Sequence, residues 1–308
     1  MTRFLDPETL AKTSGLAVKA RVIVEGALSG LHRARHHGSS VEFAQHKEYS
    51  PGDELRHIDW KAYAKLDRYY VKQFEHESQL TVHLVLDASG SMDFRGGAAI
   101  AKLEYAGYVA AALSYLLIRQ QDKVGLTVFG DRTLDAWVPP RARSTHLSDL
   151  LAVIEGVVAS GGRGDEPAAT ALERIGELAR RKRAMIILIS DLLEPASAAL
   201  TTLRRLRAQQ HDVAVFHLID PHERELPYEG LTMFQSLEDD RVLLANPGAV
   251  RREYQARMEA FLAQARRECG DGGIDYHLVT TTQPVEQALL DFLTLRANAA
   301  RAERTWTS

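Results

Sequence analysis

The run Asp87-Ala88-Ser89-Gly90-Ser91 places one carboxylate and two hydroxyl groups close together in the chain. These are hard oxygen ligands of the kind that Mg²⁺ prefers, since that ion takes octahedral oxygen coordination and usually keeps several waters. A second carboxylate, Asp191, follows another apolar run. If both apolar runs are parallel strands, the two aspartates meet at one sheet edge, where they need a cation or a shared proton. The spacing predicts a site for Mg²⁺, or alternatively for Mn²⁺ or Ca²⁺, whereas the pentapeptide alone is also compatible with a plain strand-to-helix turn.

Strand-like apolar runs alternate with helical patterns from residue 80 onward, which indicates how these carboxylates are positioned. One β-rich run, 80–86, ends at Asp87, and another, 184–189, ends at Ser190-Asp191. Further strands are expected at 124–129, 133–138, 213–219 and 274–279, with a hairpin across 238–240. Helices are expected at 10–31, 98–119, 144–158, 167–183, 195–210, 249–267 and 284–299.

This alternation predicts an α/β fold with a doubly wound, mostly parallel, Rossmann-like sheet that helices cover on both faces. In such folds the ligand site lies beyond the carboxyl ends of the strands. We expect three parts: an N-terminal extension at 1–78, the α/β domain at 79–299 and a flexible tail at 300–308.

The order of strand, Asp-x-Ser-x-Ser-Met, long helix and strand-Ser-Asp resembles von Willebrand factor A-like domains. Their metal-ion-dependent adhesion site takes ligands from three loops, and an acidic side chain of a partner usually completes the coordination. The resemblance implies that Asp87, Ser89 and Ser91 form the first loop and that Asp191 belongs to the third.

The second loop departs from the A-like pattern. Gly164-Asp165-Glu166-Pro167 stands where a Gly-x-Thr-x-Leu sequence would be expected, and Thr170 falls within the helix that follows. One expectation is that Asp165 or Glu166 replaces the threonine as a ligand, directly or through water. The alternative is an incomplete site that binds metal weakly.

Two N-terminal blocks, 38–43 and 49–60, resemble the signature of the bacterial domain-of-unknown-function-58 family, and 71–75 then leads into the first strand. Members of this family are typically encoded beside MoxR-type AAA+ ATPases and are thought to act with them. The resemblance therefore implies a MoxR-type AAA+ ATPase, or its client, as the partner, in complex assembly or chaperone-like maturation.

Composition restricts the remaining function classes. The 308 residues carry a net charge of −3, which argues against a nucleic-acid partner, and no apolar run is long enough for a membrane span. The single cysteine, Cys269, allows no disulfide within the chain, so a reducing cytoplasm is expected. Six histidines match no known set of metal ligands and are interpreted as surface or hydrogen-bonded side chains: His32, His36, His37, His46, His57 and His76.

The sequence contains no P-loop, no dinucleotide-binding fingerprint and no Gly-x-Ser-x-Gly nucleophile motif. We therefore expect a non-catalytic protein-protein interaction module rather than an enzyme. Two alternatives stay open: a metal-dependent hydrolase that uses Asp87 and Asp191, since a bound ion can activate water, and a structural adaptor with a vestigial metal loop.

Overall fold

The computed structural model describes residues 5–12, 15–36, 47–48, 70–71, 79–130, 136–180, 182–193 and 196–305. It forms two compact units, one of residues 1–31 with 80–308 and the other of residues 32–79. The smaller unit contains the short antiparallel pair β1 (Lys47–Glu48) and β2 (Tyr70–Val71). The signature blocks at 38–43 and 49–60, residues 72–75 and the side chains of the six N-terminal histidines lie outside the described residues.

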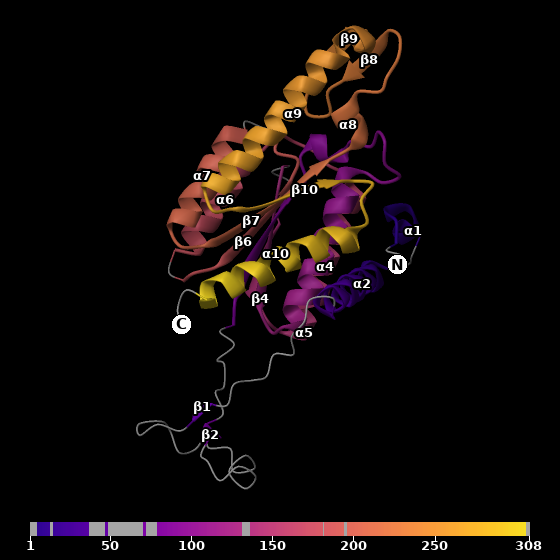
Figure 1. Ribbon diagram of the computed structural model, residues 1–308. Coiled ribbons are helices and arrows are strands. Elements are labelled where there is room, and N and C mark those ends of the chain that lie inside the picture. Colours follow the sequence, from indigo (N-terminus) through magenta and orange to yellow (C-terminus); the bar gives the residue numbers. More distant parts are fainter. Residues whose placement is uncertain are drawn as a thin grey trace. The chain divides into compact units, whose positions relative to one another are not determined.

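The larger unit is built on a six-stranded sheet in the order β10-β7-β6-β3-β4-β5 (Figure 1). Every neighbouring pair is parallel except β4 and β5, which run antiparallel. The strands are β3 (Thr81–Asp87), β4 (Lys123–Phe129), β5 (Trp137–Arg141), β6 (Met185–Ser190), β7 (Asp212–Ile219) and β10 (Asp275–Thr280). The predicted α/β class with a mostly parallel sheet is confirmed.

The edge strand β5 continues through Pro139 and Pro140, beyond the strand predicted at 133–138, of which residues 133–135 lie outside the described residues. Proline has no N–H to donate to a neighbouring strand, so it is tolerated at a sheet edge but not in a central strand. The position of β5 beside β4 alone, at the end of the strand order, explains how these prolines fit.

Helices cover both faces of the sheet (Figure 1). One face carries α4 (Lys102–Arg119), α5 (Ser144–Ser160) and α10 (Val285–Thr305), and the other carries α6 (Ala168–Leu178), α7 (Ala196–Ala208) and α9 (Pro247–Asp271). The long helix α2 (Leu16–His36) lies near the N-terminus. The shorter elements are α1 (Pro7–Ala11), the 3₁₀ turn η2 (Gly90–Asp93), α8 (Pro221–Glu225) and the hairpin β8 (Thr232–Gln235) with β9 (Val242–Ala245). The hairpin predicted across residues 238–240 is confirmed.

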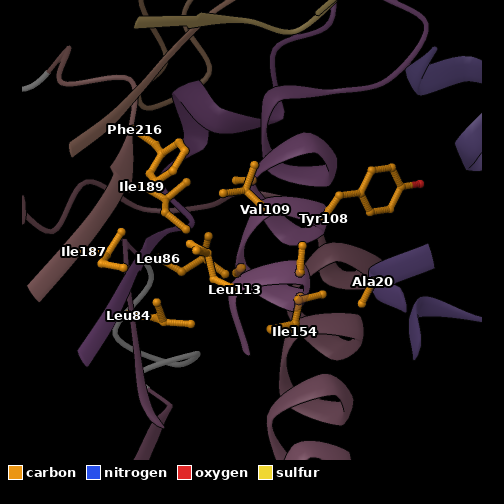
Figure 2. Close-up of a cluster of buried hydrophobic side chains, with 14 of the residues drawn as sticks. Ala20, Leu84, Leu86, Tyr108, Val109, Leu113, Ile154, Ile187, Ile189 and Phe216 are labelled. Carbon is orange, nitrogen blue, oxygen red and sulfur yellow. The ribbon is translucent and has the colours of Figure 1, made fainter. Parts of the chain in front are cut away.

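Successive residues of the central strands alternate between two buried cores, because side chains of a strand point to opposite faces. Leu84 and Leu86 of β3 belong to the first core, and Val85 between them belongs to the second. Figure 2 shows Leu86 facing Val109 and Leu113 of α4. Both cores are apolar, which explains why these strands appear in the sequence as unbroken apolar runs.

The N-terminal helices belong to the first core. Leu10 of α1 and Ala20 and Ile23 of α2 have no exposed surface. The chain forms two helices where the sequence predicts one at residues 10–31, and Gly15 between them adopts a φ of +75°, which favours glycine. At the other end, α10 continues through Thr305, so residues 300–305 are helical.

Strands β3 and β6 are neighbours, but the chain leaves them in opposite directions. From β3 it proceeds to β4 on one side, and from β6 it proceeds to β7 on the other. The helices that make these connections, α4 and α7, lie on opposite faces of the sheet. Such a reversal opens a crevice at the carboxyl ends of the two strands, where open α/β sheets bind their ligands. Asp87 and Asp191 stand at this point.

Candidate metal centre

Asp87 is the last residue of β3 and is 4% exposed. Its Oδ1 accepts a hydrogen bond from the Ser89 backbone N–H at 2.9 Å, and its Oδ2 accepts one from the Ser190 hydroxyl at 2.5 Å. The hydroxyl oxygens of Ser89 and Ser91 lie 3.2 Å apart. The first loop therefore turns tightly and gathers one carboxylate and two hydroxyl groups.

The second loop, residues 161–167, packs on the first through backbone contacts. The Gly90 N–H donates to the Gly164 carbonyl at 3.1 Å, and the Arg163 N–H donates to the Ala88 carbonyl at 2.8 Å. A Cβ on Gly162 would stand 2.3 Å from the Ser89 carbonyl oxygen, so only glycine allows this approach. The close packing brings the start of α6 beside the serines.

The third loop follows β6 and joins the first through Ser190. The Ser190 hydroxyl donates to Asp87 and accepts from the Leu192 N–H at 3.0 Å. Leu192 has a φ of +53°, an uncommon conformation for a bulky side chain and one that is often found at functional sites. Asp191 is 3% exposed, and its Oδ1 accepts from the Leu193 N–H at 3.2 Å.

Side chains from all three loops line one small cavity. Its volume open to the centre of a water-sized sphere is ≈ 20 Å³, and about 10–15 Å³ measured in this way holds one water. Six of the lining residues carry oxygen-bearing side chains: Asp87, Ser89, Ser91, Glu166, Ser190 and Asp191. The cavity therefore has room for one water-sized particle, and oxygen-bearing side chains form part of a lining whose other residues are apolar.

The two candidate replacements in the second loop differ. Glu166 lines the cavity, and its Oε1 also lies 3.5 Å from the guanidinium of Arg174. Asp165 is exposed and is not among the lining residues. Thr170 is an exposed residue of α6, as its position in the sequence predicts. Only Glu166 joins the aspartates and serines at the cavity.

Burial dominates the electrostatics of Asp87. Removal from water and, to a smaller extent, the nearby charge of Asp191 together raise the pKa of its carboxyl from 3.8 to about 7. Hydrogen bonds from Ser190 and Ser89 oppose this rise because they stabilise the ionised form. Because the charge of Asp191 acts on Asp87 and both residues line the cavity, a cation that enters the cavity is favoured by both carboxylates.

Two charged residues near the site, Lys102 and Glu223, are missed by the sequence argument. Lys102 begins α4 and has no exposed surface, and its ammonium lies 2.7 Å from Asp191 Oδ2 and also contacts Glu223 Oε1. Burial lowers the pKa of Lys102, but the charges of Asp191 and Glu223 outweigh burial and leave it raised. No local motif marks either residue, because the pairs join positions 89 and 121 residues apart.

The donor set suits a hard divalent cation in its chemistry. Carboxylate and hydroxyl oxygens are the ligands of Mg²⁺, Mn²⁺ and Ca²⁺, while soft or imidazole-preferring metals select other groups. Among the described residues, no group of three or more histidine, cysteine, aspartate or glutamate side chains could hold a metal ion. An ion at this cavity therefore depends on the hydroxyls of Ser89 and Ser91 together with the aspartates.

Comparison with known proteins identifies the family. Residues 45–264 match the family described as protein of unknown function DUF58. The chain belongs to the DUF58 family. Among curated relatives, uncharacterized proteins of Mycobacterium bovis and Mycobacterium tuberculosis are 30% identical to this DUF58 protein over 273 residues. The match covers 86% of this chain and 83% of each relative.

The solved structures that this chain is similar to include proteins from three bacteria. A conserved hypothetical protein, BatB from Bacteroides thetaiotaomicron, has a TM-score of 0.46 at 19% identity and covers 70% of this chain and 98% of its own. An aerotolerance-related membrane protein from Bacteroides fragilis, carrying multiple mutations to serine, has a TM-score of 0.44 at 19% identity. The match covers 67% of this chain and 94% of that protein. A mutant PilB minor pilin from Streptococcus sanguinis has a TM-score of 0.43 at 11% identity, with 78% and 66% coverage. Within the described part of this chain, no helix is both long and apolar enough to cross a bilayer.

Proposed function

We propose that this DUF58 protein binds a partner protein through a divalent cation held at the carboxyl ends of β3 and β6. The observation that carries the proposal is the single cavity lined by Asp87, Ser89, Ser91 and Asp191, which come from two separate loops. The position at the reversal of strand order is the usual ligand site of an open α/β sheet.

Each of these residues has a distinct part in holding the ion. Asp87 supplies the buried carboxylate, Ser89 and Ser91 supply neutral hydroxyl oxygens, and Asp191 supplies negative charge from the third loop. Glu166 stands where A-like domains use threonine. The bound ion, Mg²⁺ or alternatively Mn²⁺ or Ca²⁺, offers a coordination position to an acidic side chain of the partner.

The resemblance to von Willebrand factor A-like domains supports recognition rather than catalysis. The partner that the family resemblance favours is a MoxR-type AAA+ ATPase or its client, in complex assembly or chaperone-like maturation. Binding in the cytoplasm is part of the same proposal. No nucleic acid or membrane is required, since the net charge of −3 provides no basic surface excess.

Metal binding is tested first by titration with Mn²⁺. We expect one Mn²⁺ per chain, with Asp87→Asn and the double variant Ser89→Ala/Ser91→Ala each weakening binding at least about tenfold. Asp149→Asn is the matched control, because that side chain is 67% exposed on α5 and away from the cavity lining. Binding that is unaffected by the loop variants would refute the site.

Partner binding is tested by co-purification with a MoxR-type ATPase encoded in the same genome. We expect the wild type to recover the ATPase in Mg²⁺ and to lose it in EDTA. Asp87→Asn should fail to recover the ATPase in either condition. Equal recovery with Mg²⁺ and with EDTA would refute recognition through an ion. If no metal binds and Asp87→Asn still recovers the partner, the protein is instead a structural adaptor with a vestigial metal loop.

A metal-dependent hydrolase that uses Asp87 and Asp191 is the second candidate, because both carboxylates line the cavity proposed to hold the ion. A divalent ion bound there would lower the pKa of a water coordinated on its open side and make that water a nucleophile. Hydrolysis of a generic phosphoester or peptide substrate that requires Mg²⁺ and disappears in Asp87→Ala would support this candidate. No hydrolysis at millimolar substrate and micromolar protein would exclude it for the substrates tested.

A further inference from the structure

Lys102 is an unusual residue for the interior of a protein, because lysine is almost never fully buried unless it is paired. Its side chain has no exposed surface, and its ammonium lies between two carboxylates, those of Asp191 and Glu223. Glu223 is itself held in place, since its Oε2 accepts the Asp220 N–H at 2.9 Å. The ammonium is therefore fixed at the edge of the candidate metal centre.

Asp191 is shared between Lys102 and the cavity. Its Oδ2 accepts from the Lys102 ammonium at 2.7 Å, and its Oδ1 accepts from the Leu193 N–H at 3.2 Å. The same residue lines the cavity beside Asp87. A divalent cation in the cavity and the ammonium of Lys102 would therefore draw on the charge of one carboxylate, and at short range in a buried site they repel each other.

From this arrangement we propose that Lys102 is a built-in competing cation that neutralises Asp191 when the divalent ion is absent and weakens the hold on that ion when it is present. This inference rests on the proposed function and concerns the regulation of the same site. Four carboxylates, those of Asp87, Asp191, Glu223 and Glu166, and the one ammonium of Lys102 give this group a formal charge of −3, which one divalent ion reduces to −1.

Such a competitor suits reversible recognition. Without Lys102 the group would carry −4, and the ion would be bound more tightly and retain less positive charge for an acidic ligand of the partner. With Lys102 present, the ion keeps more of its attraction for that ligand. The lysine therefore lowers the affinity of the site for the ion and raises the affinity of the bound ion for the acidic ligand of the partner.

The test is the affinity for Mn²⁺, followed by the electron paramagnetic resonance signal of the free ion, in the full chain. Lys102→Gln removes the charge and retains donors for both carboxylates, and we expect it to bind Mn²⁺ at least about tenfold more tightly than the wild type. Lys102→Arg keeps the charge and should bind within about threefold of the wild type. Lys182→Gln, at an exposed position, should leave the affinity unchanged.

A purely structural lysine gives a different pattern, since its loss would lower the melting temperature and weaken or preserve Mn²⁺ binding. Equal affinity in the wild type and Lys102→Gln would overturn the inference while the metal site itself stands. Wild-type protein that binds no Mn²⁺ in an Asp87-dependent manner would overturn the proposed function, and this inference with it.

A second variant keeps the test decisive if Lys102→Gln does not fold. Glu223→Gln keeps the lysine and removes one of the two carboxylates that neutralise it. The positive charge of the ammonium is then compensated less, so it repels the divalent ion more strongly. We expect Mn²⁺ affinity to fall at least about fivefold in this variant. Unchanged or tighter binding in Glu223→Gln would overturn the inference.

Discussion

The carboxylate of Asp87 is expected to destabilise the protein whenever the divalent cation is absent. Burial and the charge of Asp191 raise its pKa from 3.8 to about 7. A group whose pKa is higher in the folded state stabilises the fold at low pH, and this contribution is lost as the pH rises through the folded value. Above pH 7, the ionised carboxylate therefore lowers the free energy of unfolding of the metal-free protein.

Asp87→Asn removes this charge at nearly constant size. The amide oxygen can still accept the Ser89 N–H, and the Ser190 hydroxyl can turn to accept from the amide group. Each pKa unit corresponds to about 1.4 kcal/mol, so a rise of about three units corresponds to at most ~4 kcal/mol. In EDTA at pH 8 we expect the variant to be more stable than the wild type by up to that amount, with the difference shrinking as the pH falls from 7 towards 4.

A bound divalent cation should instead make the wild type more stable than Asp87→Asn. At an ion concentration 100 times its Kd, the wild type gains about 2.7 kcal/mol, whereas Asp87→Asn gains little because its affinity is reduced. The assay is urea unfolding followed by circular dichroism, with EDTA and with Mg²⁺, at several pH values. A variant less stable than the wild type in EDTA at pH 8 would refute the reasoning, because the hydrogen bonds to the carboxylate would then outweigh its burial and repulsion.

Three further predictions concern the fold. Burial lowers the pKa of His277 to about 4, so the neutral ring stabilises the fold above pH 6.5, and this contribution falls by about 1.4 kcal/mol per pH unit as the pH falls towards 4. His277→Phe should make the pH dependence of the free energy of urea unfolding shallower by that amount, while His83 and His217 keep theirs. Parallel slopes in wild type and variant would contradict the assignment. Gly162→Ala should destabilise the protein by roughly 1–3 kcal/mol and weaken Mn²⁺ binding, because its Cβ would meet the Ser89 carbonyl. Gly156→Ala, in a helix and with nothing within 4 Å of the added Cβ, should stabilise the protein by up to about 1 kcal/mol. Thermal shifts of the same sign for both glycines would count against this account. Leu113→Ala should cost about 2–5 kcal/mol, since the side chain has no exposed surface in the first core, and a loss below 1 kcal/mol would indicate that the site collapses.

Much of the site follows from residues close together in the chain. Asp87 and Asp191 each follow an apolar run of strand length, and parallel strands bring such residues to one edge. The serines at positions 89 and 91 lie within the same turn as Asp87. These relations depend on local periodicity and on the handedness of strand connections, so the sequence is sufficient to predict them.

In the second loop, the sequence does not decide which carboxylate reaches the cavity. Asp165 and Glu166 are equivalent candidates in the sequence, because they are adjacent carboxylates in a glycine-rich loop. Backbone hydrogen bonds decide between them, since the Glu166 N–H donates to the Gly130 carbonyl at 3.0 Å and the side chain of Glu166 lines the cavity. Asp165 lies exposed one position earlier.

The sequence by itself determined the α/β alternation, the parallel sheet and the meeting of two aspartates with two serines at the carboxyl ends of its strands. Only the tertiary structure decided that Glu166 rather than Asp165 reaches the cavity, that helices α1 and α2 contribute to the first core, and that Lys102 joins Asp191 to Glu223. The physical reason is the separation along the chain over which each interaction acts. Periodicity and turn chemistry act between neighbours in the chain, whereas the pairing of buried charges depends on which distant segments packing brings within about 3 Å of each other.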